Sequence, residues 1–144
     1  MKRNVLIAAL ISLLIVFTTV QSTVQAAEET LKHVFFSAYD PDATERFNSI
    51  GDTDREATRV DVDKESWRTI AVHIATLNST SITVKIYGKV NSLWALLYSK
   101  PYSATTTDPE PITISERCSY LAVGLVSAGD AAGDSVSVQL EASK

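Results

Sequence analysis

Several residue types are scarce in this sequence of 144 residues, and their scarcity excludes some classes of protein. Cys118 is the single cysteine, so no intramolecular disulfide can form and a hydrophobic core must hold the fold unaided. Lysine and arginine number 13 against 17 acidic residues, and the formal net charge of −4 disfavours binding to a nucleic-acid backbone. We expect Cys118 to act as a small buried hydrophobic residue, with an intermolecular disulfide as the alternative.

Catalytic motifs are also missing. The two histidines, His33 and His73, have no sequence neighbour that suggests a nucleophile or a metal pair. No glycine-rich phosphate loop, zinc-ligand spacing or elbow-type serine motif occurs. A glycosidase-type carboxylate pair stays open, because such pairs meet in space and not in sequence. We therefore expect a protein that is not an enzyme.

Long apolar runs are confined to the N-terminus. Lys2 and Arg3 precede an uncharged, largely apolar stretch, and the small residues Ala26 and Ala27 follow it. This order predicts a secretory signal over residues 1–27, cleaved after Ala26 or Ala27. An uncleaved anchor is the alternative, because the apolar run approaches the roughly 20 residues that span a bilayer. We expect a secreted protein, located outside the cell, at its surface or in the periplasm.

The remaining residues, 28–144, fit one domain with its own core and contain no further membrane span. Loss of Lys2 and Arg3 would change the formal charge from −4 to −6. From residue 67 onward, apolar and polar side chains alternate with the period of a β-strand. Strands are predicted over these segments: residues 31–37, 58–62, 67–76, 81–90, 93–99, 112–114, 120–126 and 135–142.

Turn residues separate these segments at short intervals. Asn91 and Ser92 predict a hairpin, and the threonine- and proline-rich residues 101–111 predict a loop. Seven or eight short strands at this spacing predict an all-β fold, an antiparallel β-sandwich of the jelly-roll or immunoglobulin-like kind. No helix is expected after the signal.

Closely spaced carboxylates form the most unusual polar feature. Calcium takes six to eight oxygen ligands, and two such clusters folded together could supply several of them. The basic residues Arg46, Arg55 and Arg59 lie among these acids and offer a second interpretation, a solvated loop of ion pairs. The candidate calcium ligands are Asp40, Asp42, Asp52, Asp54, Asp61 and Asp63.

Aromatic residues in the central strands offer a second candidate surface, for stacking on carbohydrate. By the period of two, Trp94 lies on the same face of its strand as Leu96, and it is therefore expected to belong to the core. Tyr87 lies on the face opposite Ile86 and is the best candidate for an exposed ring. A carbohydrate- or calcium-dependent adhesion module is accordingly the alternative function.

The central hairpin runs Ile82-Thr83-Val84-Lys85-Ile86-Tyr87-Gly88, then Asn91-Ser92, then Trp94 and Leu96. It resembles the β-sandwich modules of phage virion proteins and bacterial surface proteins, and the resemblance covers residues 67–144. The resemblance implies a non-catalytic structural or adhesive module and transfers no site residue. Lys89 and Val90 stand where those modules have a more polar, glycine-containing turn.

The expected N-terminal strand suggests a mode of assembly. Val34, Phe35 and Phe36 lie in a strand-like segment directly after the signal, and such a strand could pair with the open sheet edge of a neighbouring molecule. Phe35 and Phe36 are expected to point to opposite faces. Pairing within its own domain is the alternative. The leading functional hypothesis is a secreted structural module, a subunit of an extracellular filament, coat or surface layer.

Overall fold

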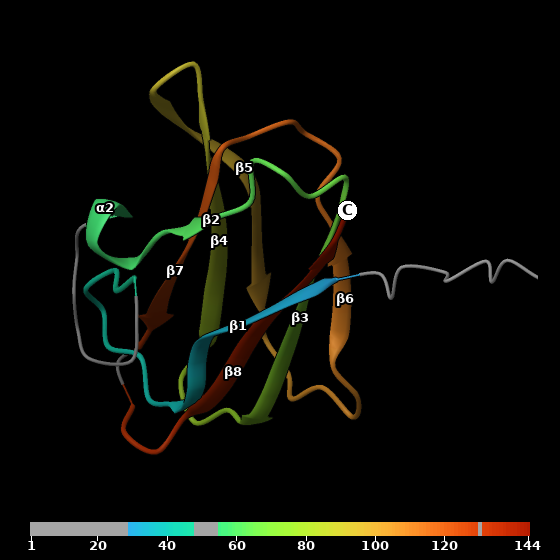
Figure 1. The fold of residues 1–144 in the computed structure, drawn as a ribbon. Helices are drawn as coiled ribbons and strands as arrows, with labels where there is room; N and C mark the ends of the chain where they lie inside the picture. Colours follow the sequence, from blue (N-terminus) through green and yellow to red (C-terminus); the bar gives the residue numbers. More distant parts are fainter. Residues whose placement is uncertain (1–28, 48–54, 130) are drawn as a thin grey trace, which may run out of the picture.

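The strands of this protein form two antiparallel sheets of four strands each (Figure 1). The computed structural model describes residues 29–47, 55–129 and 131–144. The strand order is β1-β8-β3-β6 in the first sheet and β2-β7-β4-β5 in the second. The strands are β1 (Thr30–Tyr39), β2 (Val60–Asp61), β3 (Trp67–Thr76), β4 (Ser81–Val90), β5 (Leu93–Tyr102), β6 (Glu110–Thr113), β7 (Tyr120–Ala128) and β8 (Ser135–Ser143). The predicted all-β class with two antiparallel sheets is confirmed, and the expected signal lies outside the described residues.

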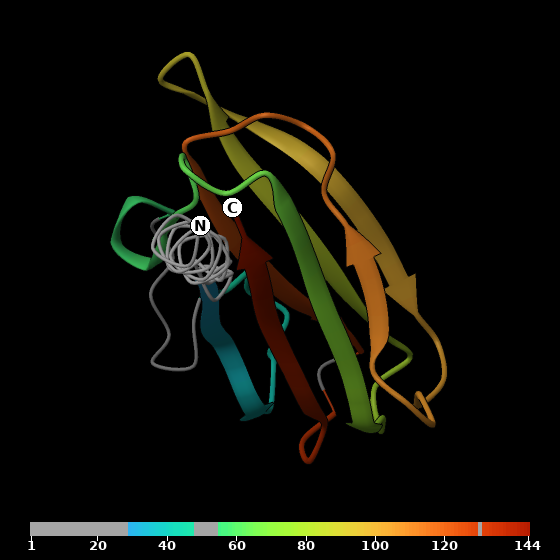
Figure 2. The same cartoon turned by 45° about the vertical axis from the view of Figure 1, so that its right-hand side comes forward.

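The two sheets lie as layers over one hydrophobic core (Figure 2). In β3 and β4 every second residue is buried, and both strands have the bounds that the sequence predicts. This period of two places one face of each strand against the opposite sheet. The largest fully buried side chains are Phe36, Ile70, Ile74, Ile82, Ile86, Leu121, Leu125, Leu140, Val62, Val72, Val84 and Val123.

The predicted hairpin between β4 and β5 is also confirmed. Asn91 and Ser92 have φ values of 48° and 67°, the left-handed values that a two-residue turn of this twist requires. The predicted loop over residues 101–111 is wrong at both ends, because Pro101 lies in β5 and Pro111 lies in β6. Both strands are sheet edges, where proline is tolerated because its missing N–H can face away from the ladder.

The segment over residues 58–62 differs from its prediction as a strand. Thr58 ends a four-residue helix, α2 (Arg55–Thr58), and only Val60 and Asp61 pair with β7. The segment therefore forms a shorter strand than its alternation predicts, because only two of its residues have partners in β7. No described helix, α2 included, is long and apolar enough to cross a membrane.

Asp134 joins the turn before β4 to the turn before β8. Its buried carboxylate accepts hydrogen bonds from the amides of Asn78 and Ser79, the latter at 3.1 Å. Burial raises the pKa of Asp134, but the hydrogen bonds from Ser79 and Asn78 outweigh burial and hold that pKa below its usual value. Asp40 in turn accepts the amides of Gly133 and Asp134. This end of the sandwich is therefore fixed by carboxylates that bind backbone N–H groups.

Candidate functional site

The outer face of the second sheet carries a cluster of charged and aromatic side chains, here called the outer cluster. The alternation in β4 turns Lys85, Tyr87 and Lys89 away from the core, and the β5 register places Trp94 beside Lys89. The segment between β1 and β2 supplies the side chains that meet them. The outer cluster consists of Glu45, Phe47, Arg55, Glu56, Arg59, Lys85, Tyr87, Lys89, Trp94 and Tyr120.

Glu45 is the centre of one half of the outer cluster. Its carboxylate accepts a hydrogen bond from Lys85 Nζ at 2.7 Å and another from the Tyr87 hydroxyl at 2.8 Å. Gly124 of β7 lies beneath it, and a Cβ at that position would collide with the Glu45 carboxylate. The neighbouring residue Arg46 exchanges backbone hydrogen bonds with Leu125 of β7. Glu45 thus holds the residues that follow β1 against the second sheet, and the missing side chain of Gly124 leaves room for the Glu45 carboxylate.

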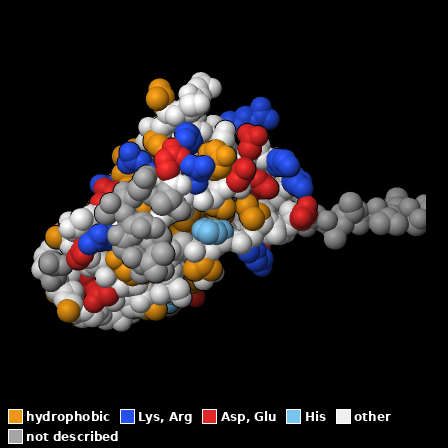
Figure 3. Space-filling view, turned by 60° about the vertical axis from the view of Figure 1, so that its left-hand side comes forward, with side chains coloured by type: hydrophobic (Ala, Val, Ile, Leu, Met, Phe, Trp, Pro, Cys, Tyr) orange, Lys and Arg blue, Asp and Glu red, His pale blue; other side chains and the backbone are white. Residues whose placement is uncertain are grey.

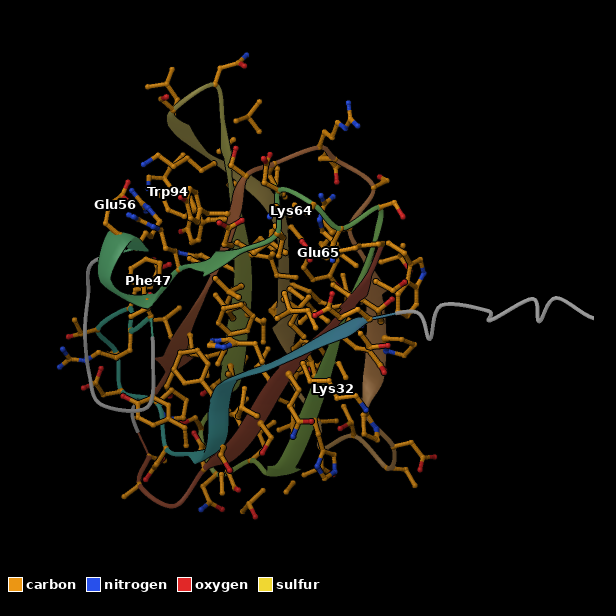
Figure 4. The ribbon with its side chains drawn as sticks, in the orientation of Figure 1. Lys32, Phe47, Glu56, Lys64, Glu65 and Trp94 are labelled. Carbon is orange, nitrogen blue, oxygen red and sulfur yellow. The ribbon has the colours of Figure 1, made fainter. Side chains whose placement is uncertain are left out.

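Glu56 is the centre of the other half. It pairs with Arg59 of its own segment and with Lys89 of β4, and its Oε1 accepts the Trp94 indole N–H at 2.9 Å. Glu56 and Trp94 point toward one another in the stick view (Figure 4). The expectation that Trp94 is a core residue is therefore wrong. The register shift between Ile86 and Tyr87 lies between Leu96 and Tyr98, so Tyr98 turns inward while Trp94 stays outside.

Cations stack on the aromatic rings of the outer cluster. The Arg55 guanidinium lies 4.8 Å from the centroid of Tyr87 and 5.5 Å from that of Phe47. Arg59 lies 4.5 Å from the centroid of Tyr120. Basic and acidic side chains lie near one another in several places on the face shown in the space-filling view (Figure 3). These cation–π contacts, together with the ion pairs, hold residues 45–47 and 55–59 on the sheet.

The ionisation of Tyr87 is changed by its surroundings in the outer cluster. Burial first, then the hydrogen bond to Glu45 and the negative charge of Glu45, raise the pKa of Tyr87 from 10.0 to about 12. A phenol with a raised pKa stabilises the fold while it is neutral. That contribution is complete below the unfolded-state pKa and is lost as the pH rises through the folded-state pKa.

We therefore expect the free energy of unfolding to fall between about pH 10 and about pH 12 as Tyr87 ionises. Urea unfolding at a series of alkaline pH values measures this. Tyr87→Phe should remove the Tyr87 share of the fall, and Glu45→Gln should shift it to lower pH because the nearby negative charge is gone. An alkaline fall that is the same in wild type and Tyr87→Phe would contradict the assignment.

The candidate calcium ligands lie in separate parts of the described fold. Asp42 is joined to the end of β7 through the bond from the Ser127 amide to its carbonyl, whereas Asp61 pairs with Tyr120 at the start of β7. Asp42 accepts the Thr44 amide and pairs with Arg46, and Asp61 accepts the Asp63 amide. Among the described residues, no three acidic, histidine or cysteine side chains come together as metal ligands.

Two of the candidate calcium ligands, Asp52 and Asp54, lie outside the described residues, so calcium binding stays a prediction. Asp63 lines a surface pocket of about 420 Å³ together with Lys89, Asn91, Arg117 and Cys118.

Burial raises the pKa of the Cys118 thiol, whose side chain is free but buried, so this thiol is poorly placed for an intermolecular disulfide.

The candidate assembly residues belong to β1, which pairs with β8 of the same chain. Val34 is exposed, whereas Phe35 and Phe36 are both buried. The expectation that the two phenylalanines point to opposite faces is therefore wrong. The register of β1 on β8 shifts between Val34 and Phe36, and the extra residue of this bulge lets adjacent side chains enter the core.

Glu45, Glu56 and Arg55 were not predicted from the sequence as partners of the central hairpin. The outward alternation of Lys85, Tyr87 and Lys89 was the signal that acidic partners should exist, but their positions some 40 residues away depend on the fold. No protein-family description matches the sequence, and no curated protein is significantly similar to it.

Proposed function

We propose that this chain is an exported, non-catalytic structural module that associates with other molecules through its open sheet edges. The observation that carries the proposal is the position of β1 and β5, two strands of ten residues, each at the edge of one sheet. Among the described strands, β1 pairs only with β8 and β5 pairs only with β4. Each sheet thus leaves one long row of backbone N–H and C=O groups at its edge, which is the surface that β-strand addition uses.

The strand order supports a jelly roll as the finer description of the sandwich. Strands consecutive in the sequence alternate between sheets along most of the chain, giving the orders β1-β8-β3-β6 and β2-β7-β4-β5. Two interlocked Greek keys produce this arrangement, and jelly rolls of this kind build viral capsids and lectin domains. The resemblance of residues 67–144 to virion and bacterial surface modules fits the same proposal, as does the signal-like N-terminus.

The outer cluster supports a structural role over a ligand-binding one. Glu45 and Glu56 are engaged by lysine, arginine, tyrosine and tryptophan groups of the same chain. The Tyr87 ring is covered by Arg55, and Lys89 lies over Trp94. Rings held in this way are occupied by the protein itself, so carbohydrate stacking is the weaker proposal.

Size-exclusion chromatography with light scattering on the purified chain from residue 28 tests the proposed function. An assembling module should elute as dimers or larger species whose mass grows with protein concentration. Negative-stain microscopy of the same sample should then show regular particles or filaments. A sample that stays monomeric at millimolar concentration would overturn the proposal.

A further inference from the structure

The part of β5 next to the hairpin turn, residues 93–99, is the least protected part of the described sheet edges. Residues 93–99 of β5 contain no charged residue and no proline. By contrast, β1 carries Lys32, two register shifts and a positive φ at Ala38, while β2 and β6 are two and four residues long. Charge, bulges and shortness are the devices by which proteins keep sheet edges from pairing with other molecules. Near its hairpin turn, β5 is protected only by its one register shift.

Exposed apolar side chains gather on the same strand. Leu93 is 75 % exposed and Leu96 is 54 % exposed. The register places Leu96 opposite Tyr87 and Trp94 opposite Lys89 on the outer face of the sheet. Leu97, at the register shift, fills the position that a side chain at Gly88 would take, next to Cys118. It therefore packs against the protein's own core. The side chains of Leu93 and Leu96 are therefore not needed for the packing of this chain.

The tip of the β4–β5 hairpin projects beyond the rest of the sandwich in both ribbon views (Figures 1 and 2). A second molecule can approach this tip without meeting the remaining loops. The chain from residue 28 has a formal net charge of −6, so two copies repel one another over most of their surfaces. An uncharged strand is the place where this repulsion is weakest.

We propose that the β5 edge pairs with the β5 edge of a second copy of this chain, antiparallel about a two-fold axis at Ala95. The inference rests on the proposed function and names the edge and the partner. An antiparallel edge is complementary to itself under a two-fold axis. In this register Trp94 of one copy lies opposite Leu96 of the second, so the exposed Leu96 of each copy is covered in a cross-strand pair. The two second sheets become one continuous sheet of eight strands.

Two lysine substitutions of matched exposure distinguish this edge from the other. Leu96 on β5 and Val34 on β1 are 54 % and 53 % exposed. Because both side chains are outside the core, Leu96→Lys and Val34→Lys should keep the wild-type fold by circular dichroism. Sedimentation equilibrium should show that Leu96→Lys weakens association by about ten-fold or more, since it places like charges in the centre of the interface, while Val34→Lys leaves it unchanged.

The outcomes separate the two proposals. If Val34→Lys dissociates the assembly and Leu96→Lys does not, the β5 inference fails while the proposed function stands. If both variants associate like wild type, the β5 inference also fails. A wild-type chain that never associates overturns both.

A cysteine at the proposed axis gives a direct test of the register. Ala95 and Ser99 are both exposed on β5, and the native Cys118 is buried. Residues on a two-fold axis of an antiparallel pair have Cα atoms within disulfide range. Ala95→Cys should therefore form a covalent dimer under mild oxidation, whereas Ser99→Cys, four residues from the axis, should not. Equal cross-linking of both variants, or of neither, would overturn the register.

Discussion

Deleting residues 28–37 should yield a chain that does not fold. The deletion removes most of β1, whose register covers β8 from Thr30 to Tyr39. It also removes Phe35 and Phe36, which are 3 % and 0 % exposed. Loss of a buried phenylalanine side chain costs about 3 to 5 kcal/mol, and a domain of this size has only about 5 to 15 kcal/mol of stability. Circular dichroism and one-dimensional proton NMR of the truncated chain measure the result.

Point substitutions provide the control for this deletion. Phe36→Ala should lower the free energy of unfolding by about 3 to 5 kcal/mol, whereas Val34→Ala, on the exposed side of the same strand, should change it by less than about 0.5 kcal/mol. A truncated chain that remains a folded monomer and no longer associates would contradict this prediction. That result would assign β1 to a neighbouring molecule, as in strand exchange.

Local alternation predicted the described strands that lie inside their sheets, with a paired strand on each side. β3 and β4 lie inside their sheets, and their buried residues follow the period of two from end to end. Their bounds could therefore be predicted from the sequence. The hairpin turn could be predicted as well, because Asn91 tolerates the left-handed backbone that the turn needs.

Register shifts explain the errors in the strands at the edges. A bulge adds one residue to a strand and reverses the facing of all residues beyond it. In β1 a shift buries both Phe35 and Phe36, and in β5 a shift separates the outward Leu96 from the inward Tyr98. Whether an edge strand contains a bulge depends on its partner and on packing across the sandwich, which one sequence does not reveal.

Only one half of the outer cluster, the outward side chains of β4, could be predicted from the sequence. The outward residues of β4 follow from alternation, but their partners Glu45 and Glu56 are placed by backbone contacts of the neighbouring described residues with β7, at Arg46 and at Val60 among others. The inward facing of Arg68, by contrast, follows from local alternation but conflicts with its residue type. Alternation in β3 places it on the inward face with Ile70, although an arginine would be expected at the surface.

Arg68 is a buried cation that joins two loops at one end of the sandwich. Its side chain donates from Nη2 to the Val62 carbonyl at 2.8 Å and from Nη1 to the Glu116 carbonyl at 3.3 Å. The residue is 3 % exposed, and no described carboxylate forms an ion pair with it. The carbonyl groups of the loops before β3 and before β7 therefore supply the polar contacts of Nη1 and Nη2, whereas the buried Nε has no hydrogen-bond partner among the described residues.

Replacing Arg68 by alanine should lower the free energy of unfolding by about 3 to 5 kcal/mol. The change leaves two carbonyl groups without their charged donor, and it opens a cavity beside Cys118, which the Arg68 charge also reaches. Urea unfolding measures the change, with Arg117→Ala as the control because Arg117 is exposed on the adjacent loop and its loss should cost less than about 0.5 kcal/mol.

Two further substitutions at Arg68 separate its packing from its hydrogen bonds. Arg68→Met restores most of the side-chain volume, so it should recover part of the loss but not the contacts to Val62 and Glu116. Arg68→Lys keeps the charge but not the planar fork that reaches two carbonyls at once, so it should remain less stable than wild type. If Arg68→Ala unfolds at the same urea concentration as Arg117→Ala, the buried guanidinium does not hold the two loops together, and the packing of Val62 alone closes this end of the core.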